Sequence, residues 1–304
     1  MIEFTSLDQM LRDTEQAGLP LWENILLSDC ARQDITREES LARMTAMLEV
    51  MVQADQGYRA GDRSASGLVG GDGGRMADYA QAGNTLCGPF LSDVMAGALR
   101  MGECNACMKR IVAAPTAGSC GVLPAVLLPY QAREGLDDDT MVRAMYVAGA
   151  IGQVVAAKAS IAGAAGGCQA EIGTASAMGA AALCYLGGGD AQAVCHAAAM
   201  AIKSMLGLVC DPIAGLVEVP CVKRNAAGAM IAMSSADMAL AGIRSAVPPD
   251  EVILAMREVG DKMDVSLKET GVGGVAGTPF GQKIAEAMEN GGDGGALPQS
   301  GKLA

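Results

Sequence analysis

The sequence predicts an all-α fold, a compact multi-helix domain rich in alanine, glycine and methionine. Aromatic residues make up only 3% of the 304-residue chain, whereas 20 methionines and long runs of alanine and glycine supply much of its 51% hydrophobic content. Small residues let helices approach closely, and methionine fills irregular gaps between them. Apolar residues recur at helical spacing, and no alternating strand pattern or fixed-period repeat persists.

The first 56 residues are expected to form amphipathic helices that pack on the main domain. Ser6 and Thr36 each stand three residues before a Gln or Glu, the spacing of the capping box that begins a helix. Apolar residues then follow at three- and four-residue steps, at positions 41, 44, 48, 51 and 52. Gly57 ends that helix. We therefore divide the chain into residues 1–56 and a helical domain of residues 57–304, which together form one structural unit.

Two loops of small residues are expected in the next part of the chain. Residues 57–74 are rich in glycine, serine and aspartate, which is typical of a long loop. Pro89 opens a helix that we expect to continue to about residue 111. Residues 114–121, with the sequence APTAGSCG, then form a small and sharply bent loop.

Caps and breaks divide the remaining chain into helices separated by irregular turns. The expected helices run from residues 137–139 to about 161, over 171–186, from 190 to about 208, over 225–241, and onward from 248–250. Irregular backbone is expected over residues 163–167 and 209–224. Thr278 caps a final helix that Gly291 ends, and the stretch after Gly291 is expected to be loop.

Composition excludes several classes of protein. A net charge of -12, a pI near 4.6 and the absence of a basic stripe argue against nucleic-acid binding. The amino-terminal 30 residues lack the apolar core of a signal peptide, so we expect a cytoplasmic protein. The uncharged residues 172–189 are mainly small, which favours a buried helix of a soluble bundle over a membrane span. Ten cysteines in a reducing compartment indicate ligands or core thiols rather than disulfides.

Three cysteines share a context that differs from that of the others. Cys210 and Cys221 stand next to prolines, eleven positions apart, and Cys168 follows two glycines. Proline and glycine hold the backbone out of regular helix, so these thiols are expected on rigid inter-helix turns where they can converge on a metal cluster. Cys104 and Cys107 form the only C-x-x-C, but no second pair accompanies them, and packed helical thiols are the simpler interpretation.

Four long motifs, in order along nearly the whole chain, carry a family resemblance. Residues 114–124, 166–183, 210–229 and 277–297 resemble the alpha subunit of iron-sulfur-dependent L-serine dehydratases, also called L-serine ammonia-lyases. The resemblance implies a helical catalytic domain that binds a [4Fe-4S] cluster and converts L-serine to pyruvate and ammonia. By motif match, the cluster ligands are Cys168, Cys210 and Cys221. It also implies an oligomer and a smaller beta subunit with a regulatory fold.

Three protein ligands suit an elimination reaction. A [4Fe-4S] cluster with only three cysteines has one open iron, which can act as a Lewis acid toward the serine hydroxyl. Pyridoxal phosphate is the usual alternative for this reaction. Lys158 and Lys203 lie in apolar helices, but no phosphate-binding motif accompanies either residue.

Candidate substrate residues lie in two of the motifs. Thr116, Gly118 and Ser119 offer hydroxyls and backbone amides for the substrate carboxylate, although a turn bonded to its own backbone explains them equally well. Lys223, Asn225 and the arginine between them follow a ligand cysteine directly, so they can hydrogen-bond the cluster or the carboxylate. A solvated turn with a helix cap is the alternative for this trio.

The chain's single histidine, His196, is a candidate for the general base of the elimination. A lone histidine among alanines is more often a satisfied core residue, and the beta subunit could supply the base instead. Ser64 and Ser66 belong to the long loop of residues 57–74, which can be a lid over the site or a plain surface linker.

Two other functions are compatible with the same residues. One is a related cluster-dependent lyase that acts on L-cysteine and releases sulfide. The other is a non-catalytic iron-sulfur redox or scaffold protein in which Cys120 completes the coordination of the cluster.

Overall fold

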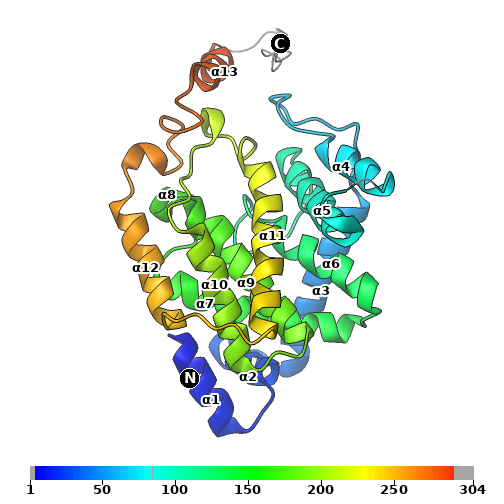
Figure 1. Cartoon of the computed structure of the whole chain (residues 1–304), viewed down its shortest axis with the longest axis vertical. Helices are drawn as coiled ribbons and strands as arrows, with labels where there is room; N and C mark the ends of the chain where they lie inside the picture. Colours follow the sequence, from blue (N-terminus) through cyan, green and yellow to red (C-terminus); the bar gives the residue numbers. More distant parts are fainter. Residues whose placement is uncertain (1–3, 84, 291–304) are drawn as a thin grey trace.

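The computed structural model describes residues 4–83 and 85–290. In this part of the chain, all elements of regular secondary structure are helices (Figure 1). The elements are α1 (Leu7–Ala17), α2 (Leu21–Gln33), α3 (Arg37–Gln56), α4 (Asp72–Gln81), α5 (Gly88–Ala106), α6 (Val122–Glu134), α7 (Asp138–Lys158), α8 (Gly163–Gly166), η1 (Gln169–Gly173), α9 (Thr174–Leu186), α10 (Ala191–Met205), η2 (Ile213–Gly215), α11 (Cys221–Leu240), α12 (Pro249–Lys262), η3 (Val265–Leu267) and α13 (Pro279–Glu289). Within this part of the chain, β pairing is limited to a single bridge between Cys210 and Lys268. The predicted all-α fold is confirmed.

Helix α9 lies at the centre of the bundle, where it packs against α7, α10 and α11. Its residues from Thr174 to Cys184 are all buried, and most of them are alanine, serine or glycine. A methyl group at Gly179 would lie 3.2 Å from the side chains of both Ala232 on α11 and Val126 on α6. The close approach of three helices at this point therefore depends on the missing side chain.

The amino-terminal helices share their hydrophobic core with the rest of the chain. Ser6 caps α1, and Thr36 forms the predicted capping box at the start of α3. The carboxylate of Asp250, in the first turn of α12, accepts the N–H groups of Leu7 (3.0 Å) and Asp8 (2.9 Å) and so ties α1 to α12. Helices α2 and α3 pack against α7. The division of the chain after α3 stays a prediction.

Three α-helices were not predicted: α4, α6 and the four-residue α8, which lies where irregular backbone was expected over residues 163–167. Helix α4 shows why. This helix begins inside the segment that we expected to be loop. We expected loop there because two consecutive glycines follow the first residue of the helix. The buried carboxylate of Glu103, on α5, accepts the N–H groups of Asp72 (2.7 Å) and Gly73 (3.2 Å) at the amino end of α4. A tertiary carboxylate thus satisfies helix donors that the local sequence leaves open.

The uncharged stretch of residues 172–189 forms the end of η1, all of α9 and the turn after it, and residues 172–184 are buried at the bundle centre. Among the described helices, α7 is the one long and apolar enough to cross a bilayer, but 67% of the relevant window is buried inside the protein. That degree of burial is typical of a core helix in a soluble domain. Thr278 caps α13 as predicted, whereas Gly291 and the stretch after it lie outside the described residues.

Candidate metal centre

Cys168 follows Gly167, a position whose backbone conformation and close neighbours only a glycine can accommodate. It is the N-cap residue of η1, a π-helical turn of the kind often found at functional sites, and it is 1% exposed. Gly167 has a left-handed φ of 76°, and a Cβ there would lie 2.6 Å from the sulfur of Met263 and 2.8 Å from the carbonyl oxygen of Leu208. A side chain would therefore be both strained and obstructed. Gly167 sets the backbone path that leads into Cys168.

Cys210 is held by the segment that follows α12. Its N–H donates to the carbonyl of Leu267 (2.8 Å), and its carbonyl accepts from the N–H of Glu269 (2.7 Å). These two bonds make the isolated bridge with Lys268. A cysteine in the middle of an irregular stretch is thus fixed by backbone that is distant in sequence.

Cys221 is the first residue of α11. The irregular stretch that we predicted over residues 209–224 ends earlier, at Pro220, and the helix begins directly after it. The Nδ2 group of Asn225, one turn later, donates to the carbonyl of Cys221 at 3.0 Å. Burial, and then the nearby Cys168 and Glu171, raise the pKa of Cys221 to about 12.

The fold brings sulfur and carboxylate ligands together. The sulfur atoms of Cys168 and Cys210 and a carboxylate oxygen of Glu171 all lie within 4.8 Å of one another, and Cys221 is close enough to feel the charge of the first and third. Gly163 forms part of the wall, since a Cβ there would lie 2.8 Å from the Cys210 sulfur. Glu171 was not predicted, although it follows Cys168 by three residues, the spacing of one helical turn.

This group of side chains fits a thiophilic metal centre. Thiolates are the ligands preferred by iron-sulfur clusters and by zinc, and these three come from separate segments that meet in a buried place. The hydrogen bond from Cys210, followed by the charge of Arg224, lowers the pKa of Cys168, so one of the thiols is biased toward the ligating thiolate form.

Arg224 and Asp211 form a buried ion pair behind Cys168. The guanidinium of Arg224 donates from Nη1 to the Cys168 sulfur (3.4 Å) and to the carbonyl of Val209 (2.8 Å), and its Nη2 lies 2.8 Å from Oδ1 of Asp211. The other carboxylate oxygen of Asp211 accepts the N–H of Val275 at 2.7 Å. One cation therefore connects the candidate ligand Cys168 to the glycine-rich segment that precedes α13.

The loop of residues 114–121 reaches the metal centre through two of its predicted residues. Thr116 lies near enough to the carboxylate of Glu171 to influence its pKa, and a Cβ on Gly118 would lie 3.4 Å from Oε1 of the same carboxylate. Burial raises the pKa of Glu171, and the neighbouring Thr116 hydroxyl partly opposes this. Ser119 is fully buried and bonds back to Thr116 within the loop, with 3.0 Å between the two hydroxyl oxygens.

The other predicted substrate residues have different surroundings. The side-chain oxygen of Asn225 accepts from the N–H of Gly121 (2.8 Å), and its amide donates to the carbonyls of Gly118 (2.8 Å) and Cys221. Asn225 thus joins the 114–121 loop to the start of α11 through backbone contacts. Lys223 is 74% exposed in its side chain and pairs with Asp72 on α4, 3.2 Å away.

His196 lies outside this group. Its Nδ1 accepts the N–H of Ser245 at 3.2 Å, and burial lowers its pKa. It stands nine residues before Met205, whose side chain contacts Gly173 beside the metal centre. At the helical rise of about 1.5 Å per residue, this separation amounts to roughly 13 Å along α10.

The loop of residues 57–71 is attached to the segment between Cys210 and Cys221 by a buried carboxylate. Ser64 donates to Oε2 of Glu218 at 2.8 Å, and Ser66 bonds the same oxygen. Glu218 is 7% exposed and lies three residues before Cys221. The loop is therefore bonded to the segment that carries the candidate ligands Cys210 and Cys221.

The remaining cysteines of the predicted alternatives are packed elsewhere. Cys104 donates weakly to the carbonyl of Ala54 (3.6 Å), and Cys120 to that of Met101 (3.7 Å). Burial raises the pKa of both thiols, that of Cys120 to about 12. In the described residues, neither belongs to the group of side chains able to hold a metal.

Comparison with known proteins gives a consistent result over most of the chain. The family model described as serine dehydratase alpha chain matches residues 16–276. The chain is 44% identical over 288 residues to a probable L-serine dehydratase alpha chain of Bacillus subtilis, which covers 95% of this chain and 96% of that protein. It is 43% identical over 279 residues to the L-serine dehydratase alpha chain of Peptoniphilus asaccharolyticus, covering 91% and 96%. L-serine dehydratase 1 of Escherichia coli is 45% identical over 183 residues, 59% of this chain and 40% of that longer protein.

Proposed function

Because the chain belongs to the serine dehydratase alpha chain family and is an enzyme of that lyase type, we propose that it is the alpha subunit of an L-serine dehydratase. The reaction removes water from L-serine and yields pyruvate and ammonia. The observation that supports this proposal best is the convergence of Cys168, Cys210 and the carboxylate of Glu171 within 4.8 Å.

In this proposal, Cys168, Cys210 and Cys221 hold a [4Fe-4S] cluster. The cluster supplies an iron that lacks a fourth protein ligand and can polarise the hydroxyl of serine. Together with the hydrogen bond from Cys210, Arg224 favours the thiolate form of Cys168 by donating to its sulfur, and Asp211 keeps Arg224 in place. The three thiols are buried, which shields a bound cluster from bulk water.

The 114–121 loop and Glu171 orient the substrate. The hydroxyl of Thr116 and the backbone of Gly118 stand beside the ligand set, where they can bind the substrate carboxylate. Glu171 can hold a proton at this place because its burial favours the neutral acid. The polar groups of Ser119, Lys223 and Asn225, in contrast, already have partners within the protein. These side chains support the 114–121 loop and α11.

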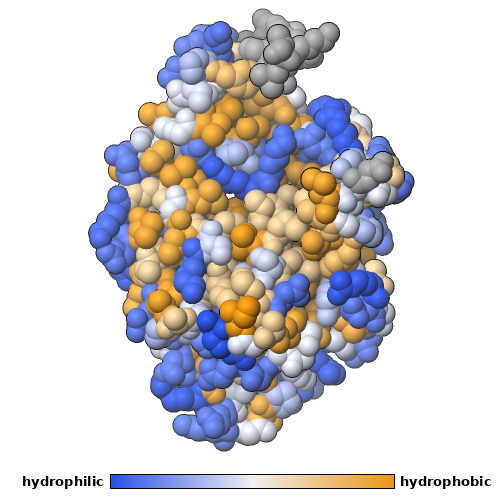
Figure 2. All heavy atoms as spheres, in the orientation of Figure 1, coloured by the Kyte–Doolittle hydropathy of each residue, from blue (hydrophilic) through white to orange (hydrophobic). Residues whose placement is uncertain are grey.

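The general base of the elimination comes either from Glu171 or from a partner chain. His196 lies away from the ligands and is the weaker candidate. We propose that a beta subunit docks where the segment between α12 and α13 presents Val265, Val272 and Val275, which are 71%, 65% and 37% exposed. Figure 2 shows apolar surface in this upper part of the molecule and over much of the centre of the same face. The enzyme is expected to be an oligomer in the cytoplasm.

Anaerobic purification tests the proposal. The protein should be brown, contain iron and acid-labile sulfide, and form pyruvate from L-serine. Cys210→Ala should lose both the cluster and the activity, whereas Cys104→Ala, a matched change at an equally buried thiol, should keep both. Colourless, iron-free protein that turns over serine would rule out the cluster, and preferential release of sulfide from L-cysteine would rule out the substrate.

A further inference from the structure

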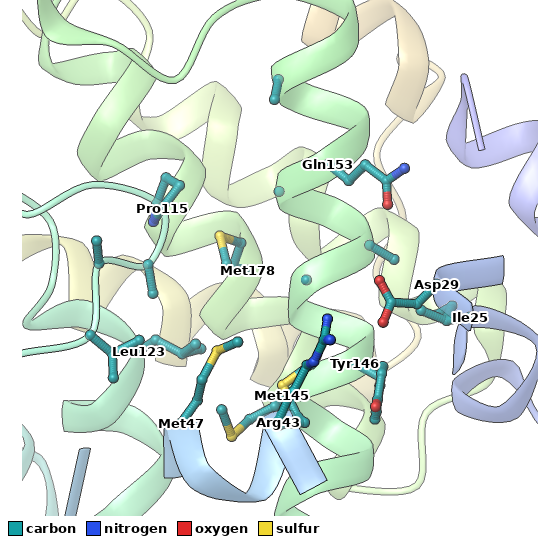
Figure 3. A pocket seen from close by; sticks show the side chains of 18 of the residues that line it. Ile25, Asp29, Arg43, Met47, Pro115, Leu123, Met145, Tyr146, Gln153 and Met178 are labelled. Carbon is teal, nitrogen blue, oxygen red and sulfur yellow. The ribbon is translucent and has the colours of Figure 1, made fainter. Parts of the chain in front are cut away.

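A cavity of about 490 Å³ lies among α2, α3 and α7, apart from the metal centre (Figure 3). Ligand sites in proteins commonly have volumes of roughly 300 to 1,000 Å³, whereas packing voids are rarely larger than a few water molecules. The lining is mostly apolar and includes five methionines: Met44, Met47, Met51, Met145 and Met178. Methionine adapts to ligands of irregular shape.

The wall of this cavity is continuous with two segments of the metal centre. Residues 112–115 line it, with Pro115 visible in Figure 3, and the next residue, Thr116, lies near the carboxylate of Glu171. Ile161 lines it as well, two residues before Gly163, whose backbone lies against Cys210 and Glu171. A molecule in the cavity would therefore contact the backbone that leads into both walls of the site.

The mouth of the cavity carries a cation without an acidic partner. Asp29 is already paired with Arg32 (2.9 Å) and accepts the hydroxyl of Ser40 (2.7 Å). Arg43 donates to the side-chain oxygen of Gln33 (3.1 Å), and no carboxylate of the described chain lies within ion-pair distance of it. In Figure 3, Arg43 and Met47 rise from α3 at the same side of the cavity. An apolar chamber whose mouth carries a guanidinium without an acidic partner matches an apolar molecule with an anionic head.

We propose that this cavity binds a small amphipathic carboxylate, with its apolar chain among the methionines and its carboxylate on Arg43, and that the bound molecule modulates the loops of the metal centre. The binding part of the proposal goes beyond the proposed function, and the modulation part rests on it. Filling the cavity would restrict residues 112–115, and through them Thr116, in the position that they occupy here.

A substitution at Gly149 can test the proposal, because an added side chain there would enter the cavity. Gly149 lines the cavity in the middle of α7, and a Cβ there meets nothing within 4 Å. Gly149→Leu should obstruct the cavity from a position where a Cβ has room, and it should favour the helix because glycine is a poor helix former. Gly152, one turn along, is unsuitable because a Cβ there would lie 2.9 Å from the sulfur of Met178.

The experiment is calorimetric titration of the complete protein, as purified anaerobically, with octanoate and, as a matched control, octylammonium. Octanoate should bind the wild type and not Gly149→Leu, and Arg43→Gln should weaken its binding by about tenfold or more. Octylammonium should bind at least tenfold more weakly than octanoate. Equal binding of the two head groups, or unchanged binding to Gly149→Leu, would overturn the proposal.

Hydrogen exchange measures the modulation without relying on turnover. Octanoate should slow exchange in residues 112–121 of the wild type and leave Gly149→Leu unchanged; identical exchange with and without octanoate would refute the modulation. If instead octanoate fails to bind and Gly149→Leu splits a dimer in sedimentation, a second copy of the chain covers the cavity and the proposal is wrong. Loss of serine turnover alone would count against the proposed function and leave these readouts intact.

Discussion

Replacing Arg224 with methionine removes the cation behind Cys168 while keeping much of the side chain's volume. The side chain of Arg224 is 16% exposed and that of Asp211 is 4% exposed, so the ion pair is buried. After the change, Asp211 would keep only the N–H of Val275 as a partner. Removing one member of a buried pair typically destabilises a protein by about 3–5 kcal/mol, because an uncompensated charge remains.

The size of the stability loss in Arg224→Met depends on which hydrogen-bond and ion-pair partners are lost. Arg224 also donates to the carbonyl of Val209 and to the Cys168 sulfur, but the thiol can bind solvent or metal instead. We therefore expect Arg224→Met to lower the free energy of unfolding by about 3–5 kcal/mol, near the range for a buried pair. The double variant Arg224→Met/Asp211→Asn should lose less than the sum of the two single variants, since it leaves no unpaired carboxylate.

Urea unfolding of the reduced, metal-free protein, followed by circular dichroism, measures these differences at a common slope. Arg257→Met is the control, because Arg257 pairs with Asp261 at 3.8 Å on the exposed face of α12. It should shift the midpoint very little. A loss below about 1 kcal/mol for Arg224→Met, or strict additivity in the double variant, would contradict the role given to this pair.

Three further predictions concern other parts of the molecule. Gly163→Ala should lower the iron content of anaerobically purified protein, because its Cβ would lie 2.8 Å from the Cys210 sulfur, whereas Gly149→Ala should leave it unchanged; equal iron contents would contradict the wall assigned to Gly163. Removing the metal with a chelator should speed hydrogen exchange in residues 209–220, whose order is linked to ligation, and unchanged exchange would oppose that link. Burial holds the pKa of His196 below its ordinary value of 6.5. The unfolded state therefore binds more protons than the folded state, and stability falls as the pH drops below 6.5. Between pH 7.5 and pH 5.5, the melting temperature of His196→Gln should fall less than that of the wild type.

Helix starts that depend on local chemistry could be predicted from the sequence. Ser6, Thr36 and Thr278 cap their helices as expected, because a short hydroxyl side chain can satisfy the first free N–H groups without help from elsewhere. The start of α4 could not be predicted in this way. Its donors are satisfied by Glu103, which comes from another helix and is about 30 residues distant in sequence.

The same division applies to the candidate site. Cys168, Cys210 and Cys221 could be selected from ten cysteines by their glycine and proline neighbours and by the resemblance of four motifs to a known family. Glu171 could not be selected, because one acidic residue in a helix carries no signal until its distance from a thiol is known. The partners of Asn225 were equally hidden from sequence reasoning, since an amide can serve a substrate or a backbone.

The sequence by itself determined the all-α fold class and the family and predicted three candidate thiol ligands, because helical periodicity, local caps and the order of the motifs can all be read along the chain. Only the tertiary structure decided which groups meet. It joined Cys210 to the segment after α12, Arg224 to Cys168, and Glu218 to the loop of residues 57–71. These contacts link residues far apart in sequence, and their geometry depends on how closely the small-residue helices pack.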